Sequence, residues 1–241
     1  MRRRLDIPAL EIVRLALALS AVLPGLVSSQ SHLRVGSAPL QLADPDPLES
    51  VGFGEGPYEE MEALLEVTIF NIDVLNLTVR VSPGTAARLA SVLDGRTQYS
   101  EELADSVGRI MLEADDVWAR QVFLRDVGLG RLTDGMRETA EKAADAGYIS
   151  EEYASSFAAA LPEWFGFLEE RGTKEGDALY FRISGDRVRT SYRTFDGHVL
   201  LDDETTDRQS RLASIPSFFA PDTRFRRRLV ESLLEDPERP R

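Results

Sequence analysis

Three short apolar runs joined by tight turns place the strongest constraint on what this chain can fold into. The dipeptides Gly185-Asp186 and Asp196-Gly197 separate the runs, and two-residue turns of this composition favour β-hairpins. Within each run apolar and polar side chains alternate, as in strands that bury one face. Successive hairpins require antiparallel strands, so we predict an antiparallel sheet. The runs are residues 178–183, 187–195 and 198–201.

The preceding part of the chain predicts helices grouped between further strands. Residues 65–81 are rich in Val, Ile, Thr and Phe, which predicts one bent strand or two short ones. Residues 118–127 predict another strand. Serines mark the starts of three helices, because serine is a favoured N-cap. The expected helices begin after Ser82, Ser100 and Ser150, and two more are expected over residues 129–146 and 221–234.

The order of these elements, β-β-α-α-β-α-α-β-β-β-α, predicts the fold class. Helices that fall between strands of an antiparallel sheet pack as a layer on one of its faces. We therefore predict an α+β fold, an antiparallel sheet backed by a helical layer. A chain of 241 residues with 43% hydrophobic residues is long enough for one well-buried core.

The composition excludes several kinds of chemistry. Cysteine is absent, and His32 and His198 are the two histidines, which excludes disulfide scaffolds, thiolate or His-rich metal sites and cysteine nucleophiles. We expect His198 at an exposed hairpin tip and His32 in a linker. The formal net charge of −13 makes nucleic acid a poor partner, because phosphate backbones repel an acidic protein. We expect no metal and no cofactor.

The N-terminal segment has the pattern of a secretory signal. Three arginines follow Met1, an apolar run follows over residues 15–27, and small residues end it. We predict export to the periplasm or the outside, with cleavage after Ser29, or an uncleaved anchor that would be the chain's only membrane contact. The alternative is a misassigned start followed by an ordinary amphipathic helix.

The remaining chain divides into a linker and one domain. Residues 30–58 contain four prolines and a glycine-rich stretch, without a sustained apolar period, as in a flexible linker. The folded domain is expected over residues 59–241. Two charge clusters within it, acidic residues 202–204 after a strand and arginines over residues 224–228, are expected to be solvated surface; the alternatives are a divalent cation site and contact with anionic lipid.

Asp73 is the polar residue that stands out within an apolar strand. It lies between Ile72 and Val74, and a buried carboxylate must be paired or protonated. Candidate partners on neighbouring strands are Arg80, Arg120 and Arg125. If Asp73 instead faces the open side of the sheet, it is an ordinary solvated strand residue.

Four stretches of the chain resemble, in the same order, the chalcone isomerase-like family. The resemblance extends over residues 59–235 and implies an open-faced β-sandwich, with a cleft between the sheet and the helical layer. It identifies the chain as a divergent, exported, bacterial member. The four stretches are residues 68–81, 119–150, 175–197 and 214–234.

The resemblance carries the fold but not the catalytic residues. Plant chalcone isomerases bind a phenolate with an arginine and position water with a threonine, a tyrosine and an asparagine. The place of the arginine falls near Pro57 and Tyr58, and the other three places fall on Asp73, Thr133 and Ala140. Because Ala140 has no hydrogen-bond donor and a carboxylate at residue 73 would repel an anion, we do not expect this reaction.

Three hypotheses of function follow. The first is a binding protein for a small hydrophobic, fatty-acid-like ligand, as in the fatty-acid-binding relatives that the resemblance implies, with Asp73, Thr133, Ala140 and Ser214 lining the cleft. The second is an isomerase or lyase of altered chemistry, in which Asp73 is the general acid or base and Thr133 a hydrogen-bond donor. The third is a protein-interaction module with an apolar patch on its helical layer.

Overall fold

The computed structural model describes residues 59–66 and 73–235. Side chains are described for these residues except Glu66, Asp73 and Glu235. The predicted signal or anchor and the linker lie outside the described residues. No helix in the described part is long and apolar enough to cross a membrane.

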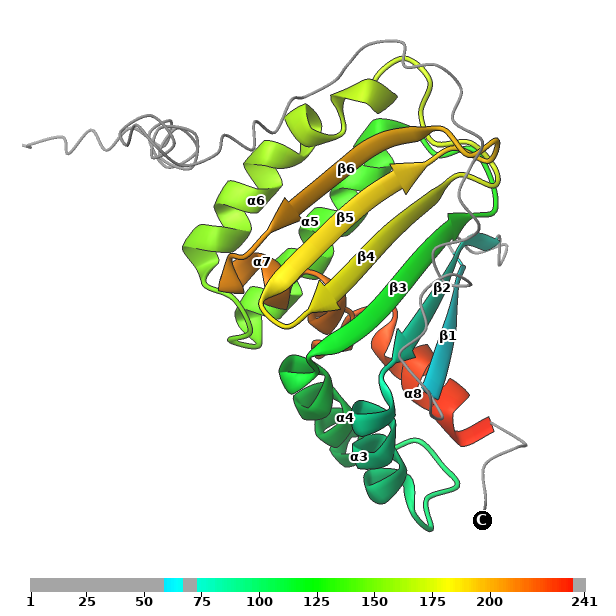
Figure 1. Cartoon of the computed structure of the whole chain (residues 1–241), viewed down its shortest axis with the longest axis vertical. Coiled ribbons are helices and arrows are strands. Elements are labelled where there is room, and N and C mark those ends of the chain that lie inside the picture. The colour runs from blue at the N-terminus through cyan, green and yellow to red at the C-terminus, as the bar shows by residue number, and fades with distance from the viewer. Residues whose placement is uncertain (1–58, 67–72, 236–241) are drawn as a thin grey trace, which may run out of the picture. The chain divides into compact units, whose positions relative to one another are not determined.

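A six-stranded antiparallel sheet forms the centre of the domain (Figure 1). Its strands are ordered as in the sequence, so each pairs with the strand before and after it. The predicted α+β class, an open antiparallel sheet backed by helices, is confirmed. The strands are β1 (Glu59–Glu66), β2 (Asp73–Val81), β3 (Asp116–Phe123), β4 (Ala178–Ser184), β5 (Arg187–Arg193) and β6 (Val199–Thr205).

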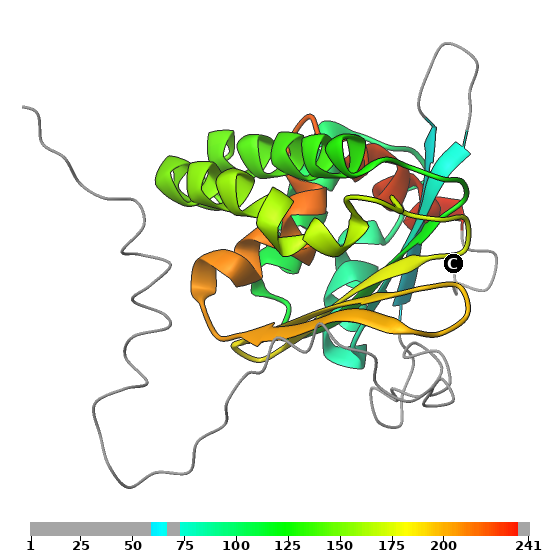
Figure 2. The ribbon, with the colours of Figure 1, turned by 90° about the horizontal axis from the view of Figure 1, so that it is seen from above.

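Helices cover one side of this sheet (Figure 2). Within this layer α5 packs along α6, and the C-terminal helix α8 packs against the edge strand β1. The helices are α3 (Pro83–Leu93), α4 (Glu101–Glu113), α5 (Leu129–Asp145), α6 (Glu151–Trp164), α7 (Arg208–Ala213) and α8 (Arg226–Glu235). Two short 3-10 helices, η1 (Gly166–Leu168) and η2 (Ile215–Phe219), complete the layer.

Local signals place the helices and turns where the sequence predicts them. The hydroxyl oxygen of Ser100 accepts a hydrogen bond from Leu103 N at 3.2 Å, and that of Ser150 accepts one from Tyr153 N at 3.1 Å. Each bond satisfies an N–H group that the helix itself leaves free. Gly185, in the hairpin turn between β4 and β5, has a positive φ of 59°, a conformation that glycine adopts without strain.

The two faces of the sheet are buried in different ways. The inward residues pack against the helices; Leu77 at the centre of β2 has no exposed surface. On the other face Trp118 and Tyr180 form a separate small cluster. The guanidinium of Arg182 lies 5.3 Å from the Trp118 ring centroid, and that of Arg193 lies 5.7 Å from the Tyr180 ring centroid. Arginines thus shield the aromatic rings on the face away from the helices.

The structure corrects several predicted strand limits. The first strand begins at Glu59, earlier than the apolar run predicts, because its inward residues alternate with glutamates that hide the pattern. The strand expected over residues 118–127 runs from Asp116 to Phe123. The acidic residues 202–204 lie within β6 and not in a turn after it, since their side chains alternate between the two faces.

The C-terminal region differs most from the prediction. The helix expected from residue 221 begins at Arg226, and α7 and η2 precede it. The carboxylate of Asp207 starts α7 by accepting a hydrogen bond from Ser210 N at 2.7 Å. Pro216 lies in the first turn of η2, and Asp222 has a positive φ of 60°. These local features shape residues 207–225, where the apolar period predicts no helix before residue 221.

We predict opposite effects of two glycine-to-alanine substitutions. Gly172 has a φ of 63°, and a Cβ there would lie 2.8 Å from the carbonyl oxygen of Val127. Gly172→Ala should therefore lower the free energy of unfolding by about 1–3 kcal/mol. Gly135 lies inside α5 with open space around its Cβ position. Gly135→Ala should raise the free energy of unfolding by about 0.4–1 kcal/mol, because it restricts the unfolded chain.

Urea denaturation of the two variants beside the parent protein measures both effects. A Gly172→Ala variant as stable as the parent would contradict the described contact between residue 172 and Val127.

Candidate functional site

A cavity lies between the inward face of the sheet and the helical layer. Its volume is about 410 Å³, within the range of about 300–1,000 Å³ usual for small-molecule sites. Strands β2, β3, β4, β5 and β6 contribute to one side of it, and α5, α6, α7 and η2 contribute to the other. The cavity therefore occupies the place where the two layers of the fold meet.

Aromatic side chains make up much of the cavity wall. The ring of Phe218 contacts Phe181 of β4 and Phe225 near α8, with ring centroids 6.0 Å and 5.2 Å apart. On α6 the ring of Phe157 stands edge-on to Trp164, 6.2 Å between centroids. Aromatic pairs of this kind hold each other in place. This part of the wall is thus apolar, and its rings pack against one another.

Several hydroxyl groups in the wall are already bonded to the backbone. Ser214 donates to the carbonyl oxygen of Arg211 at 2.7 Å, and Ser217 donates to that of Ala213 at 2.8 Å. Thr223 donates to the carbonyl oxygen of Phe218 at 2.7 Å. These hydrogen bonds stabilise the irregular segment around η2. The hydroxyl hydrogens of these three residues are therefore already used within the protein.

Two polar side chains on the sheet differ from these serines and threonines. Gln121 on β3 and Thr190 on β5 both line the cavity, and each is 6% exposed. Within the described ranges, neither side chain has a hydrogen-bond partner. The neighbours of Gln121 across the strands are Leu77 and Leu179, both fully buried. The amide atoms of Gln121 are not among the fully buried side-chain atoms that lack a partner, so they are open to the cavity, and Gln121 is the chemically distinctive group of its wall.

The cavity rim carries charges that largely neutralise one another. Glu138 of α5 accepts a hydrogen bond from Lys142 Nζ at 2.9 Å and one from Arg224 Nη2 at 2.7 Å. The hydrogen bond from Lys142, aided by the charge of Arg224, lowers the pKa of Glu138 despite partial burial. Arg131 and Asp134 are exposed on the same rim. The entrance is therefore polar and the interior apolar.

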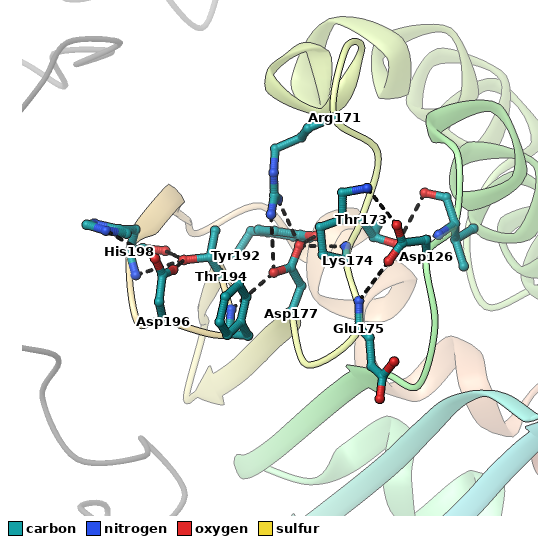
Figure 3. A network of polar contacts seen from close by, with 12 residues as sticks. Asp126, Arg171, Thr173, Lys174, Glu175, Asp177, Tyr192, Thr194, Asp196 and His198 are labelled. Atoms are coloured by element: carbon teal, nitrogen blue, oxygen red, sulfur yellow. Dashed lines mark hydrogen bonds and ion pairs between the residues drawn. The ribbon is translucent and has the colours of Figure 1, made fainter.

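A buried carboxylate organises the end of the sheet beside the cavity (Figure 3). Asp177, just before β4, has no exposed surface. Its Oδ2 accepts hydrogen bonds from Arg171 Nη1 at 2.8 Å, from Lys174 N at 2.8 Å and from the Tyr192 hydroxyl at 2.7 Å. Its Oδ1 accepts one from Phe195 N at 3.1 Å. One side chain thus joins the loop before β4 to the end of β5 and the turn after it.

The hydrogen bonds determine the ionisation of this group. Burial opposes the charge on Asp177, but the bonds from Arg171, Tyr192 and two backbone N–H groups outweigh it, so the pKa of Asp177 is lowered. Burial, reinforced by the Asp177 carboxylate, raises the pKa of the Tyr192 hydroxyl. At neutral pH Asp177 is therefore charged and Tyr192 protonated, as their hydrogen bond requires.

Two contacts connect this network to the cavity. The Tyr192 ring lies 6.2 Å from that of Phe123, which lines the cavity. Val127, another lining residue, donates its N–H to Thr173 Oγ1 at 3.1 Å, and Thr173 N donates to Val127 O at 2.8 Å. The network thus holds two residues of the cavity wall.

Of the predicted site residues with described side chains, one lines the cavity. Ser214 lines the cavity. Thr133 donates its hydroxyl to the carbonyl oxygens of Leu129 and Gly130 in its own helix, at 3.1 Å and 3.0 Å. Ala140 belongs to a second apolar cluster. Among the lining residues that the structure describes, Thr133 and Ala140 do not appear.

Asp73 is placed through its backbone alone. It begins β2 and pairs with Glu66 next to an irregularity in the β1–β2 register; its side chain lies outside the described residues. Of its candidate partners, Arg80 is bound to Glu60, with Nη2 and Oε2 2.6 Å apart. The hypothesis that Asp73 acts with Thr133 as an acid or base stays a prediction.

The predicted acidic and basic clusters both form ion pairs with other parts of the fold. Asp202 accepts two hydrogen bonds of 2.6 Å from Arg189. Among the described residues, no group of three or more His, Asp or Glu side chains is placed to hold a metal ion. Arg226 corrects the expectation of a solvated basic face, because it is 3% exposed and lies 2.6 Å from Asp105 of α4. The ion pair between Arg226 and Asp105 attaches α8 to α4.

Exposed large apolar side chains bear on the hypothesis of an interaction module. In the described part of the chain none of them lies on a helix. They are Leu124, Phe195, Val199 and Leu200. The expected patch on the helical layer is therefore not seen there.

Comparison with known proteins gives similarity to solved structures but to no described family. No family model and no curated protein matches the sequence. Among solved structures the chain is similar to a fatty-acid binding protein of Arabidopsis thaliana, with a TM-score of 0.42 and 12% sequence identity. The alignment covers 80% of this chain and 100% of that chain. At this TM-score and identity the similarity assigns neither a ligand nor an activity to the chain.

We predict that the Asp177 carboxylate stabilises the fold in a pH-dependent way. Asp177→Asn should lower the free energy of unfolding at pH 7 by about 2–3 kcal/mol, because it weakens hydrogen bonds to a charged group. The pKa of Asp177 is lowered in the folded state, so its contribution is full above the unfolded pKa of about 3.9 and is lost as pH falls through the folded value. The difference between parent and variant should therefore shrink below about pH 4.

Urea denaturation between pH 7 and pH 3 measures this difference. Asp134→Asn is the matched control, because Asp134 forms an exposed ion pair with Arg137 and such pairs contribute little. A difference for Asp177→Asn that stays constant with pH would contradict the ionised network.

Proposed function

We propose that this protein binds a small apolar molecule in the cavity between its sheet and its helices. The observation that carries the proposal is the cavity itself, about 410 Å³ in volume and lined mainly by aromatic and aliphatic side chains. An apolar ligand that leaves water for such a site gains about 25 cal/mol for each Å² of apolar surface buried.

The surroundings of the cavity support a binding site more than a packing defect. Its wall includes two sets of rings in contact, Phe157 with Trp164 and Phe218 with Phe181. The charges of Glu138 and Arg224 lie at its entrance. An apolar interior with a polar entrance is typical of small-molecule sites.

The proposal also includes a ligand class, a protein family and export from the cell. We take the ligand to have fatty-acid-like apolar character and the chain to be a divergent bacterial member of the chalcone isomerase-like family. The four collinear sequence stretches support the family, and the charged and apolar segments at the N-terminus support export. The intact mass of the protein recovered from its host distinguishes cleavage after Ser29 from an uncleaved anchor.

We predict that filling the cavity abolishes binding of an apolar probe. Val188 is an inward, cavity-lining residue of β5 and is 3% exposed. Val188→Phe places a ring in the space that the ligand would occupy. Titration with the neutral fluorophore N-phenyl-1-naphthylamine should give saturable fluorescence enhancement with the parent protein, and an affinity at least about tenfold lower with Val188→Phe.

The same substitution on the surface is the control. Val199 is 50% exposed at the start of β6, so Val199→Phe should bind the probe like the parent. Circular dichroism of both variants confirms that they fold. Probe binding that is absent from the parent, or equal in the parent and a folded Val188→Phe variant, would overturn the proposed site.

A further inference from the structure

We propose that Gln121 receives a neutral hydrogen-bonding group of the ligand, such as a hydroxyl or a carbonyl, deep in the cavity. This inference rests on the proposed function and names the class of ligand: an apolar molecule with an uncharged polar group at its buried end. Thr190 offers a second polar position on the same face of the sheet.

The position of Gln121 makes its amide available to a ligand. It lies on β3, near the middle of the sheet, and β2 and β4 flank it on both sides. Its inward neighbours on β3 are Ala119 and Phe123, both at most 3% exposed. The residue as a whole is 6% exposed and lines the cavity. Since no described residue bonds to it, its donors and acceptor face the space that a ligand would fill.

The hydroxyl groups on α7 and around η2 do not offer the same chemistry. Ser214, Ser217 and Thr223 donate their hydroxyl hydrogens to backbone carbonyl groups. Ser210 lies 2.9 Å from the Tyr153 hydroxyl and also bonds to Asp207. In contrast, the Gln121 amide has two N–H donors and one acceptor oxygen with no assigned partner, so it can bond to a hydroxyl or to a carbonyl.

The charges around the cavity favour a neutral group over a carboxylate at this depth. The basic lining residues, Arg131, Lys142 and Arg224, belong to the rim, and the latter two are paired with Glu138. No basic side chain among the described lining residues comes from the sheet. A carboxylate beside Gln121 would be buried without a counter-charge, which is costly.

Thr190 also lines the cavity, but it lies at a different point on the sheet from Gln121. It pairs with Phe181 on β4, whereas Gln121 pairs with Leu179. The two side chains are therefore separated by one strand and are offset along it by two residues. A ligand bonded to Gln121 need not reach Thr190, so Gln121 carries the main test.

The experiment compares three ligands that share one ring system. They are 2-naphthol, 2-methylnaphthalene and 2-naphthoate, which carry a neutral hydroxyl, a methyl group and a carboxylate. Each displaces N-phenyl-1-naphthylamine from the parent protein and from the Gln121→Met, Thr190→Val and Thr78→Val variants. Thr78 is 4% exposed on the adjacent strand β2 but is not part of the described cavity wall, so Thr78→Val is the matched control for Thr190→Val.

The proposal predicts a definite order of affinities. The parent should bind 2-naphthol about fivefold more tightly than 2-methylnaphthalene, as expected for one added hydrogen bond, and 2-naphthoate most weakly. Gln121→Met should bring the ratio of the first two affinities close to one. Thr78→Val should keep the ratio of the parent.

Different results would overturn the inference and the proposed function. Equal affinity of the parent for 2-naphthol and 2-methylnaphthalene, a preference for 2-naphthoate, or an unchanged ratio in Gln121→Met would overturn the role of Gln121 while the cavity remains a binding site. If Gln121→Met does not fold, the order of the three ligand affinities measured with the parent protein tests the role of Gln121. Failure of the parent to bind the fluorophore would overturn the proposed function itself.

Discussion

Burial of one face of a single antiparallel sheet is the constraint on which the other features of this structure depend. The inward residues of all six strands must be covered, and the helices between the strands and after them cover that side (Figure 2). Aromatic side chains line the cavity from both layers, with Phe123 and Phe181 on the sheet and Phe157 and Trp164 on α6. The cavity therefore lies where the sheet and the helical layer meet.

The buried polar groups of the domain fall into two kinds, and the contrast indicates which are structural. Asp177 has four hydrogen-bond donors and joins segments distant in the sequence. Arg226 is likewise buried against Asp105 and attaches α8 to α4. Gln121 is 6% exposed and lines the cavity, yet no described residue bonds to it. Since polar groups at such a position ordinarily have a partner, Gln121 is where binding chemistry is expected.

The sequence predicts most of the fold because its signals are local. The turn at Gly185 has the predicted two residues, and Gly185 adopts the positive φ that such a turn needs. The turn at Gly197 is longer than the predicted two residues, because β5 ends at Arg193 and β6 begins at Val199. Ser100 and Ser150 cap their helices through their own side chains. The strand from Glu59 is harder to predict, since its four glutamates obscure the apolar alternation. The division of the C-terminal region depends on the Asp207 cap and on Pro216, which a search for apolar period overlooks.

The candidate site was less predictable because it depends on contacts between distant residues. Ser214, expected from the family resemblance, lines the cavity, but its hydroxyl is bonded to the backbone. Gln121 could have been noticed as an inward position in β3, between Ala119 and Phe123. The role of Asp177 required knowledge that Tyr192 and Phe195 return to it from the next hairpin. No pattern within a single element contains that information.

Native mass spectrometry of the protein purified from its own host tests the central claim most directly. The account predicts a folded protein that carries one small molecule per chain, which organic extraction then releases as an apolar compound with an uncharged polar group. A folded protein at the mass of the chain alone, which also fails to take up N-phenyl-1-naphthylamine, would contradict the claim that the cavity is a ligand site.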